Sequence, residues 1–140
     1  MRSILLLTLV VALILGFIRE LNRRLNDVIM NPYRLQAAGD LLIDYMESRN
    51  CWPTNWADLK QFTETPGHGL QGVREFHEIE QNVRVDFSFD PMSFSTAPNS
   101  LDEDSHLTVV VANNGTTHGA TRDPNTAIRD YLIGKLKAAD

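Results

Sequence analysis

The sequence predicts an α+β protein. An N-terminal transmembrane helix continues into further helices, and a small antiparallel sheet of two or three strands and a C-terminal helix come after them. Three observations lead to this prediction. Residues 4–18 form an apolar run without a charged side chain. Residues 83–90 alternate strictly between apolar and polar side chains, as a half-buried strand does. Residues 124–136 carry apolar side chains at helical spacing, and this order of elements favours α+β over a wound βαβ sheet.

Charge is distributed unevenly along the chain. The 140 residues carry a formal net charge of −5. Residues 1–30 hold four arginines and two acids, a charge of +2, whereas residues 31–140 hold nine basic and sixteen acidic residues, a charge of −7. Because an acidic domain repels phosphate backbones, we expect no nucleic-acid partner. Basic residues beside an apolar segment suit an anionic membrane surface, so the expected partners are membrane lipid and other membrane proteins.

The N-terminal apolar run is slightly short for a membrane span, which needs about 20 apolar residues. Arg2 and Arg19 flank the run and can extend toward lipid head groups. We therefore expect residues 1–30 to form an uncleaved membrane anchor helix with a juxtamembrane extension, and residues 31–140 to form a small globular α+β domain. Two alternatives stay open, a cleaved secretory signal peptide and a helix buried in a soluble protein.

The orientation of this anchor depends on two opposing features. The arginines after the run would by themselves place the domain in the cytoplasm. The tail ahead of the run is only three residues long, as in a single-pass signal anchor that exports the domain on its C-terminal side. We expect the domain on the extracytoplasmic side.

Asn31-Pro32 marks the boundary between two predicted helices, because asparagine is a good N-cap and proline suits the first helical position. The second helix carries an amphipathic stripe that is expected to face the core. The apolar members of this stripe are Leu35, Ala38, Leu41, Leu42, Tyr45 and Met46. Gly39 in the same helix is either a local weakness or a site of close packing.

A tryptophan-rich stretch comes after this helix. Pro53 prevents the preceding helix or loop from continuing. Asn55 with Asp58 three residues later is typical of the start of a short helix. We expect Trp52 and Trp56 to pack where the short helix meets the long one. The alternative is an aromatic platform that binds a ligand.

The same stretch resembles a known family over about residues 35–59. The residues that carry the resemblance are Leu41-x-x-x-Tyr45, then Trp52-Pro53-Thr54, then Leu59. They look like the junction in type II secretion pseudopilins and related type IV pilin-like proteins. In that family a long membrane-anchored helix ends in a tyrosine-containing turn, and the helix packs on a small antiparallel sheet. The structural junction residues that we expect on this basis are Tyr45, Trp52, Pro53, Trp56 and Leu59.

Processing signals of that family are placed differently here. Pilin-like precursors carry a cleavage glycine and a phenylalanine ahead of the apolar segment, with a glutamate in its first turn. In this chain Gly16-Phe17 and Glu20 come after the apolar residues. The resemblance therefore implies the layout of the family without a prepilin cleavage site and without assembly into a pilus.

The second half of the chain supplies the predicted sheet and the last helix. Residues 106–112 are apolar on both faces, so we expect a central second strand. Asn113-Asn114-Gly115 is a hairpin signal, and residues 116–120 are a candidate third strand. Asp123-Pro124 starts the C-terminal helix, with the aspartate as N-cap. A further short helix is predicted over residues 73–81.

No chemistry-bearing residues form a recognisable catalytic motif. The candidate metal ligands are the carboxylates and the four histidines His68, His77, His106 and His118. The histidines show no HxH or HxxxH spacing. Cys51 has no partner cysteine and is expected to pack as a small apolar residue. Residues 67–72 match G-x-G-x-x-G, but no strand precedes them. The acidic run at 102–104 lacks the spacing of a calcium loop and is expected to be a solvated loop.

We therefore predict a membrane-anchored structural or protein-interaction module with a pilin-like layout. We expect no catalytic activity, no cofactor and no metal, and the sequence identifies no small-molecule substrate. The alternative hypothesis is a membrane-anchored, metal-dependent hydrolase whose site combines His77, His106, His118 and nearby acids.

Overall fold

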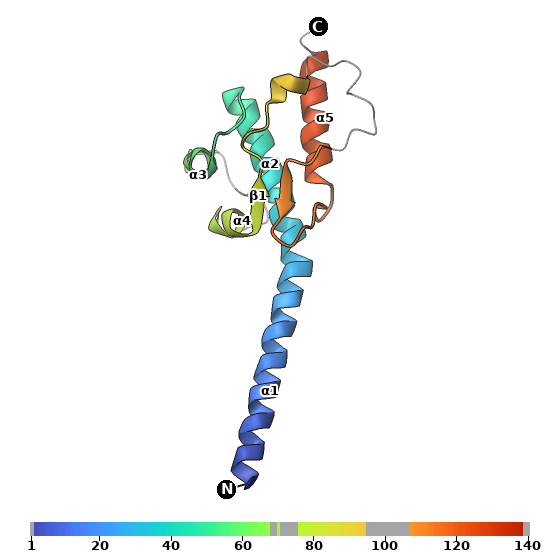
Figure 1. Cartoon of the computed structure of the whole chain (residues 1–140). Coiled ribbons are helices and arrows are strands. Elements are labelled where there is room, and N and C mark those ends of the chain that lie inside the picture. The colour runs from blue at the N-terminus through green and yellow to red at the C-terminus, as the bar shows by residue number, and fades with distance from the viewer. Residues whose placement is uncertain (1, 68–69, 71–75, 95–106, 139–140) are drawn as a thin grey trace. The chain divides into compact units, whose positions relative to one another are not determined.

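The computed structural model describes residues 2–67, 70, 76–94 and 107–138 (Figure 1). Several predictions lie outside these residues: those for most of the glycine-containing loop, for the acidic run at 102–104, and for His68 and His106. The chain divides into two compact units, Met1–Met30 and Asn31–Asp140.

The first unit is helical. Helix α1 spans Arg2–Leu25 and is followed by the π-helical turn η1, Asn26–Met30. Glu20 accepts hydrogen bonds from Arg23 and Arg24 at 3.0–3.1 Å, one turn along the helix. These hydrogen bonds hold the pKa of the Glu20 carboxyl below its usual range.

The predicted transmembrane helix is wrong. Within the described part of the chain, no helix is both long enough and apolar enough to cross a membrane. The uncharged apolar run of the sequence covers only residues 4–18 and ends at Arg19, whereas a span needs about 20 apolar residues. The single-pass signal anchor and the extracytoplasmic position of the domain were expected because of this span. These two predictions are therefore wrong as well.

The second unit has the predicted α+β composition. Its helices are α2 (Asn31–Arg49), α3 (Trp56–Thr63), α4 (Phe76–Asn82) and α5 (Pro124–Lys137), with a 3₁₀ turn η2 at Pro91–Phe94. Strands β1 (Val83–Val85) and β2 (Val110–Ala112) form a two-stranded antiparallel sheet in which Val83 pairs with Ala112 and Val85 with Val110. Helix α2 is central, because it contacts α3, α4, α5 and both strands (Figure 1).

The core of this unit forms around the predicted stripe of α2. Leu35 and Leu42 are fully buried, and Tyr45 packs at the edge of the core. The other fully buried large apolar side chains are Leu59, Ile79, Val83, Val110 and Ile128. Each helix and both strands that contact α2 therefore contribute to a single hydrophobic core.

Gly39 is a site of close packing. A Cβ atom at Gly39 would lie 2.6 Å from Cβ of Pro124, closer than two non-bonded carbon atoms approach in proteins. The absence of a side chain therefore lets the start of α5 approach α2. Asp123 caps α5 as predicted, because its Oδ1 accepts hydrogen bonds from the backbone N–H groups of Asn125 at 2.8 Å and Thr126 at 3.4 Å.

Asn31 has a different role from the predicted N-cap. Its Oδ1 accepts a hydrogen bond from Nη1 of Arg34 at 3.1 Å, and both residues are buried. Nη2 of Arg34 lies 3.5 Å from Oε2 of Glu78 on α4. The arginine charge is thus paired within the fold, and the pair connects α2 to α4.

Strand β1 is shorter than the alternating pattern predicts. It ends at Val85, and Oδ1 of Asp86 then accepts hydrogen bonds from N and Oγ of Ser88 at 3.0 and 2.6 Å. An aspartate that bonds to the backbone two residues ahead forms a turn, which ends the extended conformation. The alternation continues in the sequence, but the backbone no longer follows a strand.

The predicted third strand is absent, since residues 116–120 of the described chain adopt no regular structure. Gly115, at φ +87°, completes the predicted turn after β2. The chain then runs back to α2, where N and Oγ1 of Thr121 donate to Oε1 of Gln36. The free edge of β2 is instead occupied by a side chain from α5.

Candidate functional site

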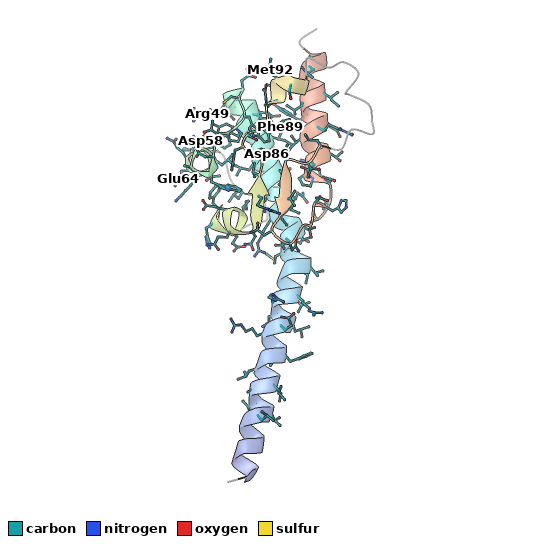
Figure 2. All side chains as sticks on the ribbon, viewed as in Figure 1. Arg49, Asp58, Glu64, Asp86, Phe89 and Met92 are labelled. Carbon is teal, nitrogen blue, oxygen red and sulfur yellow. The ribbon has the colours of Figure 1, made fainter. Side chains whose placement is uncertain are left out.

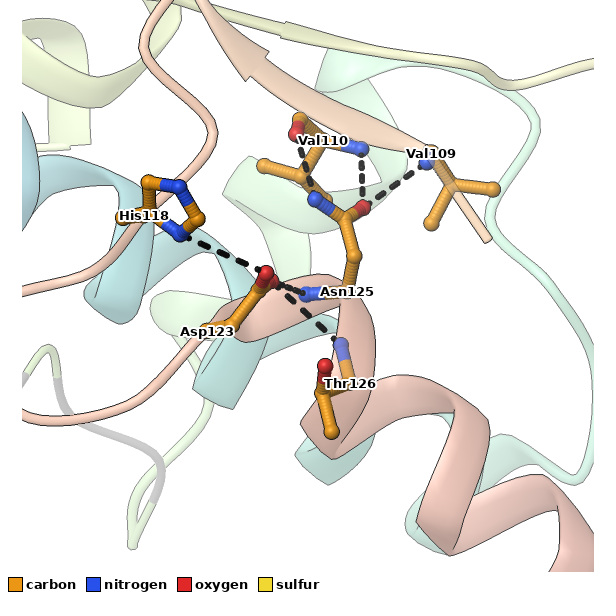
Figure 3. A network of polar contacts seen from close by, with 6 residues as sticks. All are labelled: Val109, Val110, His118, Asp123, Asn125 and Thr126. Carbon is orange, nitrogen blue, oxygen red and sulfur yellow. Dashed lines mark hydrogen bonds and ion pairs between the residues drawn. The ribbon is translucent and has the colours of Figure 1, made fainter. Parts of the chain in front are cut away.

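The side chain that occupies the edge of β2 is Asn125. Its Oδ1 accepts hydrogen bonds from the backbone N–H groups of Val109 and Val110 at 2.8 and 2.9 Å, and its Nδ2 donates to the carbonyl of Val110 at 2.9 Å (Figure 3). The amide therefore bonds to β2 as a neighbouring strand would. Asn125 is only 4% exposed, so these three groups are removed from water together.

The predicted junction residues lie on the last turns of α2, in the connection between α2 and α3, and on α3. Helix α2 ends where Asn50 adopts a positive φ of 55° and donates from its N–H to the carbonyl of Met46. Trp52 and Pro53 come next, and both are buried. Leu59 on α3 is also fully buried, so the junction residues are part of the core.

Trp52 connects this junction to the segment after β1. Its Nε1 donates to the backbone carbonyl of Asp86 at 3.0 Å. Its ring contacts the ring of Phe89 edge to face, with centroids 5.1 Å apart. Asp86 and Phe89 are both labelled in Figure 2. The indole is 8% exposed and has its polar atom satisfied, so it presents no open stacking face to a ligand.

Trp56 and Tyr45 extend the same aromatic packing. The Trp56 ring makes edge contacts with Phe76 and Phe87 at 5.8 and 5.4 Å, and Tyr45 makes one with Phe62 at 5.3 Å. Burial raises the pKa of the Tyr45 phenol, and the nearby Cys51 and Asp58 raise it further. Aromatic partners therefore surround the tryptophans, an arrangement that packs α3 and α4 against α2. The sequence identified the tryptophans but not these partners.

Side-chain hydrogen bonds cap the start of α3. Oδ1 of Asn55 accepts from the N–H of Asp58 at 3.1 Å, and Oδ2 of Asp58 accepts from N and Oγ1 of Thr54 at 2.9 and 2.6 Å. The hydrogen bonds from Thr54 lower the pKa of the Asp58 carboxyl. Because the folded pKa is lowered, this carboxylate stabilises the fold above the ordinary aspartate pKa, and that contribution is lost as the pH falls through the folded value.

Replacing Asn55 by alanine is expected to lower the free energy of unfolding by roughly 0.5–2 kcal/mol, because the N–H of Asp58 loses its acceptor. Urea unfolding followed by circular dichroism measures the change. Gln61→Ala, at an exposed position of the same helix, serves as the control and should shift stability by less than about 0.5 kcal/mol. Equal effects of the two substitutions would contradict the capping role.

The histidines of the hydrolase hypothesis do not form a metal site in the described structure. His77 lies exposed on α4, and His118 is exposed with its Nδ1 3.7 Å from Oδ2 of Asp123 (Figure 3). Across residues 2–67, 70, 76–94 and 107–138, no group of three or more His, Cys, Asp or Glu side chains could hold a metal ion. His106, the third histidine of that hypothesis, lies outside these residues.

The grooves of the second unit are open to solvent rather than enclosed. One, of about 140 Å³, lies between the end of α2 and α5 and includes the exposed Cys51. This volume is below the roughly 300–1,000 Å³ of typical ligand pockets. A wider groove of about 440 Å³ is lined mainly by residues 122–131, including Arg122, which forms an ion pair with Asp40. Neither groove combines an enclosed apolar cavity with converging polar groups.

The largest exposed apolar surface described lies on α1. Leu13, Leu15 and Phe17 are 61–69% exposed, and side chains project from α1 on both sides in Figure 2. The further large apolar side chains exposed on this helix are Leu9, Val10, Val11, Ile14, Ile18, Leu21 and Leu25. The sequence pointed to this surface, but we interpreted it as a membrane span.

Comparison of the chain with known proteins gives no relative from which a role could be transferred. The resemblance of residues 35–59 to pilin-like proteins stays a prediction. No model of a known protein family, no curated protein and no solved structure matches the chain.

Proposed function

We propose that the protein is a non-catalytic protein-interaction module that binds its partner through α1. The observation that carries this proposal is the exposure of large apolar side chains along the helix, with Leu13 at 66% and Phe17 at 69%. Contiguous apolar surface of this kind marks interaction sites on proteins. Covering each large side chain contributes roughly 1.5–3 kcal/mol.

The second unit supports a structural role better than a catalytic one. Its buried Asn125 and Arg34, the latter paired with the partly exposed Glu78, join secondary-structure elements. Its tryptophans pack edge to face against other aromatic rings. With a charge of −7 over residues 31–140, this unit repels nucleic acid, so the expected partner is a protein.

Photo-crosslinking tests this proposal. A benzophenone amino acid at Phe17 is expected to give adducts with a protein partner in the cells that make the chain. The same amino acid at Met92 is the matched control, because Met92 is 68% exposed in the second unit and Phe17 is 69% exposed. The absence of adducts from Phe17, or equal adducts from both positions, would contradict binding through α1.

A further inference from the structure

We infer that the partner of α1 is α1 of a second copy of this chain, paired in parallel as a two-stranded coiled coil. This inference rests on the proposed function and names its partner. Its first support is the spacing of Ile18, Leu21 and Leu25, which recur at three and four residues where the rest of the helix is polar. The same register continues back through the apolar half of α1. The residues in this series, which we call the α1 seam, are Val11, Ile14, Ile18, Leu21 and Leu25. A repeat of three and four residues places one edge of a helix against a partner with the same repeat.

The second support is the narrowness of the apolar stripe in the C-terminal half of α1. Between Arg19 and Leu25, only Leu21 and Leu25 are apolar. Glu20 lies off the seam and accepts hydrogen bonds from Arg23 and Arg24, so these charges are paired along their own helix. A stripe confined to the seam positions is typical of a two-stranded coil rather than of a helix buried in a globular core.

The residue types on the seam also favour two strands. In heptad notation, Val11, Ile18 and Leu25 occupy position a, and Ile14 and Leu21 occupy position d. β-branched residues at position a with leucine at position d favour a parallel dimer. Val11 and Ile18 at position a and Leu21 at position d have this composition, whereas Ile14 at d and Leu25 at a do not.

The third support, which sets the orientation, is the difference between the two halves of α1. Residues 9–18 are apolar on every face, whereas residues 19–25 are polar outside the seam. An antiparallel pair would place the arginines of one helix beside the apolar half of the other. A parallel pair matches apolar with apolar and polar with polar, which avoids burying charge.

The area available is sufficient for a dimer. The seam residues are each 46–52% exposed, so they have surface to lose. Because each of these residues is only about half exposed, the ten side chains in a dimer would bury at most roughly 800 Å² of apolar surface. Flanking side chains, such as Leu15 and Phe17, add to this. Only together with these flanking side chains does the total approach the roughly 1,200 Å² at which stable, specific interfaces begin.

Disulfide formation between two copies tests the register. The chain has one cysteine, Cys51, so Cys51→Ser provides a cysteine-free background. In a parallel coil each d residue faces its own counterpart, so Leu21→Cys in this background should give a disulfide-linked dimer under mild oxidation. Arg19→Cys, on the outer face, is the control and should stay largely monomeric. Equal cross-linking at both positions, or none at Leu21→Cys, would overturn the proposed register.

Sedimentation analysis of the full chain tests the dimer itself. We expect the mass of two copies, and Leu21→Gln should raise the dimer dissociation constant by roughly tenfold or more, because it places a polar group in the seam. Arg19→Gln introduces the same residue outside the seam and should leave the constant within about twofold. A monomer overturns the inference, including a monomer whose α1 binds phosphatidylcholine vesicles instead.

The two proposals can fail separately. If Phe17 cross-links to a different protein while the chain sediments as a monomer, the proposed function stands and the second copy is excluded as its partner. If the chain is a monomer and Phe17 gives no adduct, both proposals fail.

Discussion

Replacing Asn125 by alanine is expected to destabilise the second unit by roughly 3–5 kcal/mol, because it leaves three buried backbone groups without partners. These groups are the N–H of Val109 and both the N–H and the carbonyl of Val110, all bonded to the amide of Asn125 in Figure 3. Val109 and Val110 are 3% and 0% exposed, so water reaches them poorly. Urea unfolding followed by tryptophan fluorescence measures the loss.

Asn113→Ala is the matched control for this substitution. Asn113 is also an asparagine bonded to the backbone, because its Nδ2 donates to the carbonyl of Gln81 at 2.6 Å, but it is exposed. Its replacement is expected to cost roughly 0.5–1.5 kcal/mol, the net value of one hydrogen bond. If Asn125→Ala costs no more than Asn113→Ala, the amide does not act as the missing neighbour of β2.

Trp52→Ala is expected to cost roughly 3–5 kcal/mol, the range for a large aromatic side chain removed from a core. The substitution leaves a cavity beside Phe89 and removes the donor to the carbonyl of Asp86. Because the lost contacts join the end of α2 to the segment after β1, we also expect the near-ultraviolet circular dichroism of the folded protein to weaken. Chemical unfolding of the variant measures the change in stability.

Trp52→Phe tests the contribution of the hydrogen bond to stability separately from that of the ring packing. Phenylalanine retains a ring against Phe89 but cannot donate to Asp86, so we expect a smaller loss of roughly 1–2 kcal/mol. Trp56→Phe, at a half-buried position, should cost less than Trp52→Ala. A cost below about 1 kcal/mol for Trp52→Ala would contradict the central place of this indole in the core.

Local features of the second unit were readable from the sequence. The apolar stripe of α2, the cap at Asp123 and the cap at Asn55 all depend on residues within four positions of one another. The extent of the strands could be predicted only in part from the sequence. The alternation from Val83 placed the start of β1, but a side-chain turn at Asp86 ended the strand three residues later.

Only part of the candidate site could be predicted from the sequence. The sequence singled out the junction residues Tyr45, Trp52, Pro53, Trp56 and Leu59, and most of them are buried. It could not supply their partners, because Phe87 and Phe89 reach the tryptophans from another segment of the chain. The exposed apolar side chains of α1 were visible as a pattern, yet their interpretation as a membrane span was wrong.

The α+β class, the positions at which α3 and α5 begin and the face that α2 buries could all be predicted from the sequence. These features depend on short-range periodicity and capping, which are properties of neighbouring residues. The role of Asn125 at the edge of β2 and the contact of Gly39 with Pro124 became apparent only in the folded chain. These contacts join residues far apart in the chain, and they form only when the whole core packs, so no local pattern predicts them.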